Sequence, residues 1–211
     1  MSKVITIDYQ GKKLRVDLET MKAVEQPEYV IPFNHSVRFD ENPFGIFPVT
    51  WTSKNLDIDD GEGGIMRNPD HPEYGCYYTW EAAKRIASKI PGWHLPTMQE
   101  WDMLAVIAGG SDVAGKNLKS KNCWEPDAAG EDLFGFNARP AGYYNGNNGS
   151  FYNVGSDAGF WTATEYDGSW LSAPGYDSRR ACSRYIATGA SIGSGSSSKY
   201  FQYSVRLVKD S

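Results

Sequence analysis

The stretch that decides the fold reads PGWHLPTMQEW, residues 91–101. Thr97 and Glu100 in it form a capping box, in which each side chain accepts a hydrogen bond from a backbone N–H that the first turn of a helix leaves unpaired. Apolar residues then recur at helical spacing until the Gly109-Gly110 pair ends the pattern (Trp101, Leu104, Ala105 and Ala108). The sequence therefore predicts a helix from about residue 98 to residue 108.

A second helix is predicted just upstream, at about 80–89. Thr79 is placed to cap it, and its apolar residues fall on one face (Trp80, Ala83, Ile86, Ala87 and Ile90). An apolar stripe of this kind indicates that the helix docks on a sheet.

The region after residue 115 is predicted to be mostly β-structure, because short apolar or aromatic runs alternate there with Gly, Asn, Asp and Pro. Asn145-Gly146 predicts a hairpin with a two-residue loop. Residues 201–207 predict the last strand, which ends the chain inside a sheet. Its core face would hold Phe201, Tyr203, Val205 and Leu207, and its other face Gln202, Ser204 and Arg206.

The N-terminal region predicts a separate small piece. Two apolar-rich runs, within residues 4–7 and 14–18, flank Gln10-Gly11-Lys12-Lys13 and indicate a β-hairpin. Four prolines within residues 26–48 indicate a linker or an irregular wrapping segment. We therefore expect an N-terminal piece over residues 1–45 and one domain over residues 46–211.

Composition narrows the class of partner. The chain has 211 residues, a net charge of −5, 40% hydrophobic and 14% aromatic residues, and no run of five basic residues. These values disfavour disorder, nucleic acid and anionic membranes, and the expected ligand is neutral or mixed in charge. No window approaches 18 apolar residues, and the N-terminus lacks an apolar core of signal-peptide length, which predicts a soluble chain without a Sec-type export signal.

The candidate metal and redox residues favour structural roles. The three cysteines are far apart in the sequence, at Cys76, Cys123 and Cys182. Free, half-buried thiols are therefore expected, and the sequence alone does not exclude one disulfide bridge. The acidic patch over residues 57–62 departs from a calcium loop, because Gly61 and Asn68 stand where oxygen ligands are needed, and a solvated turn is favoured.

Other titratable residues give no better constellation. The histidines are widely spaced and are interpreted as turn or core residues (His35, His71 and His94). Glu125-Pro126-Asp127 is a weak match to the triplets of calcium-dependent lectins, and a turn that contains Asp127 is favoured. No catalytic residue, no metal ligand and no cofactor is predicted.

Residues 186–198 read IATGASIGSGSSS, and nearly all of them are Ser, Gly, Ala or Thr. Such a composition is typical of flexible linkers. Only one predicted strand follows it before the chain ends, so a surface loop of the domain is favoured over a linker.

Five segments carry a resemblance to a known family: YGCYYTWEAA (74–83), PGWHLPTMQEW (91–101), FGFNARPAGYYNGNNGSFYNVG (134–155), FWTATEYDGS (160–169) and KYFQYSVRLVKD (199–210). Together they resemble the Fibrobacter-type paralogous domain, a branch of the formylglycine-generating-enzyme-like C-type lectin fold, over about residues 45–211. The resemblance implies an α+β, C-type-lectin-like fold with two helices and a small twisted antiparallel sheet. It also implies a loop-rich frame, stiffened by Trp93, Trp101, Trp161 and Arg206, preceded here by the short N-terminal β-hairpin.

This fold also houses the variable proteins of diversity-generating retroelements, whose binding face is rewritten by adenine-directed mutagenesis. That process yields many residues but not Lys, Glu, Gln, Met or Trp, and residues 171–198 contain none of the five. Tyr, Ser and Gly, frequent in this stretch, are the residues that paratopes use. The variable segment is placed at about 165–202. Its expected ligand-binding residues are Trp170, Ser172, Pro174, Tyr176, Ser178, Arg179, Ser183, Tyr185, Ala187, Thr188, Ser194, Ser196, Tyr200 and Phe201.

The resemblance thus implies a receptor-binding protein that is not an enzyme: a phage receptor-binding tip protein on the virion, or a bacterial adhesin at the cell surface. The expected partner is a protein or glycan receptor on a cell surface, with no nucleic acid and no direct membrane insertion. The resemblance is compatible with a homo-oligomer. Residues 1–45 would serve attachment or assembly. The alternatives are an undiversified carbohydrate-binding lectin module and a formylglycine-generating-enzyme-like oxidoreductase. The latter needs a cysteine pair in the late strands, where Cys182 stands alone.

Overall fold

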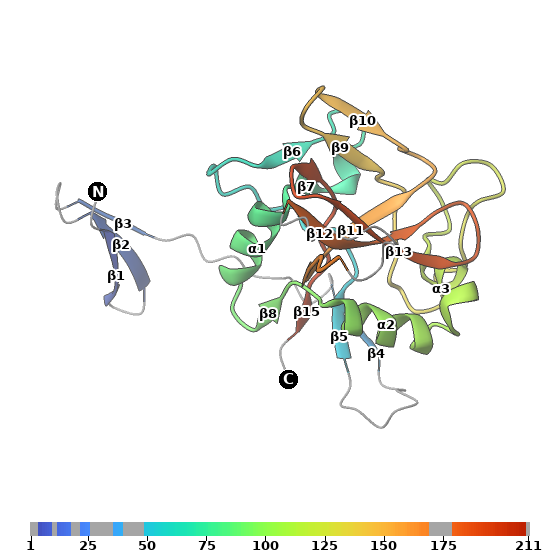
Figure 1. Cartoon of the computed structure of the whole chain (residues 1–211). Helices are drawn as coiled ribbons and strands as arrows, with labels where there is room; N and C mark the ends of the chain where they lie inside the picture. The colour runs from blue at the N-terminus through green and yellow to red at the C-terminus, as the bar shows by residue number, and fades with distance from the viewer. Residues whose placement is uncertain are drawn as a thin grey trace. The chain divides into compact units, whose positions relative to one another are not determined.

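The structure is a computed structural model that describes residues 4–9, 12–17, 22–25, 36–39, 49–168 and 179–209 (Figure 1). The chain divides into two compact units, residues 1–30 and residues 31–211, and each is described by itself.

The first unit contains the predicted hairpin and one strand more. β1 (Val4–Tyr9) pairs antiparallel with β2 (Lys12–Asp17), and β2 pairs with β3 (Lys22–Glu25). The hairpin is therefore confirmed, while β3 was not predicted.

β4 (Ser36–Phe39) belongs to the second unit, although it lies inside the stretch predicted as a linker or wrapping segment. It pairs antiparallel with β5 (Val49–Thr52), so at least these four residues are part of a sheet. The second unit thus begins upstream of the expected boundary near residue 45.

Both predicted helices are confirmed. In α1 (Trp80–Ser88) the Thr79 hydroxyl accepts a hydrogen bond from the Ala82 amide. α2 (Met98–Ile107) begins with the full capping box, because Thr97 accepts from the Glu100 amide and the Glu100 carboxylate accepts from the Thr97 amide. A short 3-10 helix, η2 (Pro72–Tyr74), precedes α1.

The expectation of two helices is wrong, because α3 (Ser111–Leu118) follows α2 directly. Its sequence, SDVAGKNL, contains a glycine and no strong apolar stripe, so propensity gives little signal. Packing requires Gly115, since a Cβ there would lie 2.2 Å from the carbonyl oxygen of Ser191. Tertiary contact, rather than local preference, selects this helix.

The strands of the second unit form several small antiparallel sheets instead of the single small sheet expected. The described residues are therefore mixed α+β. A four-stranded sheet has the order β4-β5-β15-β8, with β8 at Trp93–His94 and β15 at Val208–Lys209. β6 (Ile65–Arg67) pairs with β7 (Cys76–Tyr78).

Two three-stranded sheets carry the candidate site. One has the order β10-β9-β14, with β9 at Tyr143–Asn145, β10 at Ser150–Tyr152 and β14 at Phe201–Gln202. The other has the order β11-β12-β13, with β11 at Ala158–Glu165, β12 at Arg180–Ile186 and β13 at Ile192–Ser198. In Figure 1 the sheet β11-β12-β13 lies between the hairpin β9–β10 and the helices α2 and α3.

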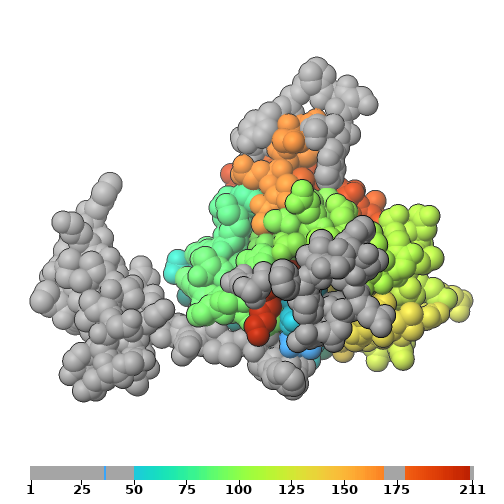
Figure 2. Space-filling model, turned by 90° about the horizontal axis from the view of Figure 1, so that it is seen from below, coloured from blue at the N-terminus to red at the C-terminus, as the bar shows by residue number. Residues whose placement is uncertain are grey.

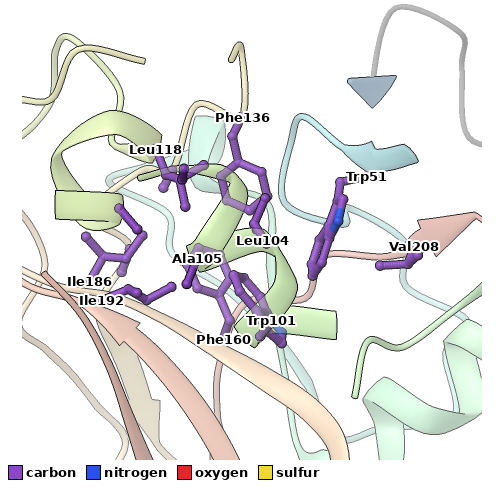
Figure 3. Packing of buried hydrophobic residues seen from close by; sticks show 14 of the residues in the cluster. Trp51, Trp101, Leu104, Ala105, Leu118, Phe136, Phe160, Ile186, Ile192 and Val208 are labelled. Atoms are coloured by element: carbon purple, nitrogen blue, oxygen red, sulfur yellow. The ribbon is translucent and has the colours of Figure 1, made fainter. Parts of the chain in front are cut away.

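The largest apolar core lies between α2, α3 and one face of the sheet β11-β12-β13. Figure 3 shows Trp101 beside Phe160, with Ile186 and Ile192 next to each other. The Trp101 and Phe160 ring centroids are 5.2 Å apart, and Trp51 from β5 meets Trp101 edge-on at 4.8 Å. Figure 2 shows the face that carries α1 and α2, in teal and green, with β15 in red beside them.

The segment predicted as a regular last strand is built differently. β14 ends at Gln202, and Ser204 to Val208 are all buried, so the expected alternation between a core face and an open face is wrong. Backbone hydrogen bonds explain this, because the segment bonds Tyr78 on one side and Thr52 and Leu56 on the other. The strand that lies inside a sheet is β15, directly after the predicted segment, between β5 and β8.

Arg206, predicted on the face opposite the core residues and, from the resemblance, as a residue that stiffens the frame, has a side chain 0% exposed to solvent. Its guanidinium donates hydrogen bonds to the carbonyl oxygens of Thr52, Phe136 and Asn137 and to the Asn55 side chain, at 2.7 to 2.9 Å. It also lies 4.5 Å from the centre of the Phe136 ring. Burial lowers its pKa to about 9. Acceptors for four of its five N–H groups make this burial possible.

Candidate ligand-binding face

The sheet β11-β12-β13 has two unlike faces, because successive residues of a strand point to opposite sides. Ile186 and its partner Ile192 belong to the core face, under α2 and α3. Tyr185 and its partner Gly193 belong to the other face. This second face is the candidate ligand-binding face.

Tyr185 is held on this face by a glycine. A Cβ placed on Gly193 would lie only 2.3 Å from Cζ of the Tyr185 ring, so the ring lies over the glycine. Tyr185 is nevertheless 46% exposed to solvent. A ring supported from below and open above is an ordered, accessible contact surface.

The Tyr203 ring also lies over a glycine, on the neighbouring strand β11. Gly159 on β11 is the other cross-strand partner of Tyr185, and a Cβ there would lie 2.4 Å from Cδ1 of the Tyr203 ring. The Tyr203 ring also meets Trp161 edge-on, with 4.8 Å between centroids. Burial raises the pKa of Tyr203. Two glycines thus allow two tyrosine rings to lie against the sheet.

Further rings continue from Tyr203 onto the sheet β10-β9-β14. Tyr143 lies 5.5 Å from Tyr203 between ring centroids, and it stacks on Tyr152 at 5.3 Å and on Phe201 at 5.4 Å. Tyr152 is 38% exposed. We call these five residues the aromatic row: Tyr143, Tyr152, Tyr185, Phe201 and Tyr203.

Amides lie at the end of the row, in the loop between β9 and β10. The Asn145 side chain accepts a hydrogen bond from the Asn147 amide, and Asn148 Nδ2 donates to the Tyr152 hydroxyl at 2.7 Å. The hairpin at Asn145-Gly146 is therefore confirmed, but its loop has four residues, 146–149, rather than two. Gly149, with φ +70°, takes the left-handed conformation that a tight two-residue turn would have required of Gly146.

A buried lysine holds the turn that joins β12 to β13. The Lys119 ammonium donates to the carbonyl oxygens of Ala187, Thr188 and Gly189, at 3.3, 2.8 and 2.9 Å. It also lies 4.8 Å from the centre of the Trp124 ring, and burial lowers its pKa. Sequence reasoning missed this role, because one lysine in KNLKSKN carries no pattern.

Residues 49–209 match the family described as the Fibrobacter succinogenes major domain. This chain belongs to that family. No curated protein and no solved structure is detectably similar to the chain. In the part of the major domain and its flanks that the structure describes, no helix is long and apolar enough to cross a membrane.

The Ser/Gly-rich stretch 186–198 is part of the major domain, as predicted, but it is not a loop. Ile186 ends β12, residues 187–191 form a turn, and β13 pairs with β12 in an unbroken register of seven residue pairs. Ser and Gly have low strand propensity, so the composition pointed to a loop. The neighbouring strand supplies the order that the residues lack.

The expected ligand-binding residues fall in different environments. Five lie outside the described residues: Trp170, Ser172, Pro174, Tyr176 and Ser178. Exposed ones are Arg179, Tyr185, Thr188, Ser194 and Tyr200, and partly buried ones are Ala187, Ser196 and Phe201. Ser183 is buried, at 4% exposure.

The two faces of the sheet divide this set further. Ser194 and Ser196 pair with Arg184 and Cys182, on the face opposite Tyr185, and Ser196 accepts a hydrogen bond from Arg180. Composition alone does not show which face of the sheet β11-β12-β13 each of these residues occupies. The prediction also lacked Tyr143, Tyr152 and Tyr203, for which the aromatic and Asn-rich run AGYYNGNNGSFY was an available signal.

The acidic patch over residues 57–62 is not wholly solvated, because one of its carboxylates forms ion pairs at the C-terminal end of α1. The Asp60 side chain is 2% exposed and accepts hydrogen bonds from Arg85 Nε at 2.9 Å and from Lys89 Nζ at 2.7 Å. The Arg85 hydrogen bond, above all, holds the pKa of Asp60 far below its usual range. The expectation of a simple solvated turn is therefore wrong for Asp60. Within the described residues, no group of three His, Cys, Asp or Glu side chains is placed to hold a metal ion.

The cysteines and histidines have structural surroundings. All three cysteines are free; Cys76 and Cys182 are buried, whereas Cys123 is exposed rather than half-buried. His94 Nε2 lies 2.6 Å from the Glu100 carboxylate, beside the capping box, and His71 stacks on Tyr74. His35 lies outside the described residues. Asp127 has φ +66° in a turn closed by the Ala128 amide and the Glu125 carbonyl, as the sequence predicted.

Proposed function

We propose that this chain is a ligand-binding protein whose recognition surface is the aromatic row together with the adjoining face of β13. The observation that carries the proposal is the placement of Tyr185 and Tyr203 over glycines. Rings that are ordered before binding lose little conformational freedom when a partner arrives. Tyrosine adds large contact area at low entropic cost, and small neighbours leave that area accessible.

We further propose that the scaffold is C-type-lectin-like and that the protein is a variable protein of a diversity-generating retroelement. Two capped helices, small antiparallel sheets and a late Ser/Gly-rich strand support the scaffold. The absence of Lys, Glu, Gln, Met and Trp from residues 171–198 supports diversification. The function would be receptor binding by a phage tip protein or a surface adhesin, with residues 1–45 used for attachment or assembly.

Cell binding tests the first proposal. Fluorescently labelled protein is mixed with a panel of bacterial strains and measured by flow cytometry, and Tyr185→Ala is compared with Tyr74→Phe, which changes a buried ring away from the row. We expect Tyr185→Ala to weaken binding at least tenfold, with an unchanged melting temperature, and Tyr74→Phe to bind normally. A folded Tyr185→Ala protein that binds as well as the wild type contradicts the proposed surface.

Genomic context tests the second proposal. The DNA that flanks the gene should encode a reverse transcriptase and carry a second, Asn-richer copy of the codons for about residues 165–206. A locus with neither element contradicts diversification, while it leaves the ligand-binding proposal intact.

A further inference from the structure

Four of the five residues of the aromatic row, all but Tyr185, lie on segments without charge, and so does the neighbouring β13. Residues 141–156, 186–198 and 200–205 contribute β9, β10, β13, β14 and their turns, and they contain no Asp, Glu, Lys or Arg, although charged residues make up 22% of the chain. A charged ligand would find no counter-charge within these segments. Protein interfaces are also depleted of Lys, Glu and Asp at their core, but they are enriched in Arg, which these segments lack.

The hydroxyls and amides beside the row are neutral and both donate and accept, while the charged groups that act on Tyr203, Arg180 and Asp157, lie outside these segments. Ser197 Oγ and the Tyr203 hydroxyl lie 3.0 Å apart, and the Asn148 amide bonds the Tyr152 hydroxyl. Hydroxyls and amides offer a donor and an acceptor at the same place. A ligand whose own groups are hydroxyls, which also do both, is the natural complement.

The rings supply the apolar half of such a site. Tyr185 lies over Gly193 with its other side open, and Tyr152 ends the stack that begins at Phe201 and Tyr143. The face of an aromatic ring is electron-rich. The C–H groups on one side of a sugar ring carry small positive charges, so they pack favourably on such a face while the sugar hydroxyls reach neutral donors and acceptors.

We infer that the aromatic row binds a neutral oligosaccharide, with Tyr185 and Tyr152 as its stacking platforms. This inference rests on the proposed function and names the ligand class for the same surface. Because Tyr185 and Tyr152 are both exposed, at 46% and 38%, we expect a ligand of several sugar units that contacts more than one ring.

Two glycine variants isolate the Tyr185 platform. Neither Gly193 nor Gly189 has a left-handed backbone, so alanine is tolerated at both. In Gly193→Ala the new Cβ would displace the Tyr185 ring. Gly189 lies in the turn between β12 and β13, outside the recognition surface, and in Gly189→Ala nothing lies within 4 Å of the new Cβ. The pair therefore differs in whether the Tyr185 ring is displaced.

The full chain is titrated calorimetrically with neutral gluco-, manno-, galacto- and xylo-oligosaccharides and with oligogalacturonate as an acidic probe. We expect binding of at least one neutral probe, a loss of tenfold or more in Gly193→Ala and Tyr152→Ala, and less than twofold in Gly189→Ala. Equal losses in the two glycine variants, or binding of the acidic probe alone, overturn the inference.

Cell binding separates this inference from the proposed function. Cells are treated either with periodate, which cleaves sugar diols, or with protease, and binding is measured at low and high salt. Loss after periodate, with little effect of salt, supports a neutral glycan. Binding that survives periodate and is lost after protease overturns the glycan but keeps the proposed function. Binding to no cell and no probe overturns both.

Discussion

β13 and the segment 202–208 are separated by only three residues, yet they have opposite physical characters. β13 is Ser/Gly-rich and closes the β11-β12-β13 sheet at one end, with most of its residues partly or fully exposed. The later segment is buried from Ser204 to Val208 and bonds to strands and loops on both sides. The first has few side-chain partners to lose, whereas the second has many. The comparison separates a replaceable surface from a fixed frame.

Removing Arg206 should have the largest effect on the frame. Arg206→Met leaves three buried carbonyls and Asn55 without their donor, so we expect a loss of about 3 to 5 kcal/mol in the free energy of unfolding. Urea unfolding measures it. Arg67→Met is the control, since Arg67 is exposed and pairs with exposed Asp57, and it should cost about 0.5 kcal/mol. Similar losses in both variants would mean that burial of Arg206 does not distinguish the frame.

The ion pair at Asp60 should give a smaller effect that depends on pH. Asp60→Asn removes the carboxylate that binds Arg85 and Lys89, and should cost about 2 kcal/mol at pH 7. Because the folded protein holds the pKa of Asp60 below its ordinary value of 3.8, this contribution is present above about pH 4 and is lost as the pH falls further.

Unfolding curves between pH 7 and pH 3 test this behaviour. The wild type should lose its advantage over Asp60→Asn as the pH drops. Asp59→Asn serves as the control, because the Asp59 side chain accepts a hydrogen bond from the exposed Gly61 amide. A constant difference between the wild type and Asp60→Asn across this range would show that the carboxylate is not the stabilising group.

The sequence predicted the parts of the frame that local chemistry determines. The capping box at Thr97 and Glu100 and the apolar stripe of α1 depend on neighbours within one or two turns, and both are present. The resemblance to the Fibrobacter-type paralogous domain agrees with the match over residues 49–209. α3, β13 and the burial of Arg206 depend on partners far along the chain, which no local pattern encodes.

The candidate face was predicted only in part for the same reason. Composition pointed to the late segment and to Tyr185, but the row is completed by Tyr143 and Tyr152 from another sheet. The register of β12 and β13 determines which Ser residues share a face with Tyr185. Register is a tertiary property when the strand consists of Ser and Gly.

The helix cap at Thr97 tests whether a local part of the frame acts independently of the face. Thr97→Ala should lower the free energy of unfolding by about 1 kcal/mol, since it removes the acceptor for the Glu100 amide. Ligand or cell binding should be unchanged at temperatures where the protein is folded. Thr97→Ser, which keeps the hydroxyl, should restore most of the stability. Weaker binding by fully folded Thr97→Ala would contradict the separation of frame and face.

The smallest effect is expected on β13 itself, at Ser194, which is exposed and pairs with Arg184 across the strands. Ser194→Thr adds one methyl group that favours a strand, so the free energy of unfolding should change by less than about 0.5 kcal/mol in either direction. Urea unfolding and amide hydrogen exchange along β12 and β13 measure the change.

Ser204→Thr is the matched substitution in the frame. Because Ser204 is buried and bonded to Asn55, the same methyl group should cost about 1 to 3 kcal/mol there. If Ser194→Thr proved as costly as Ser204→Thr, β13 would be as tightly constrained as the segment that follows it, and the contrast between a replaceable strand and a fixed frame would fail.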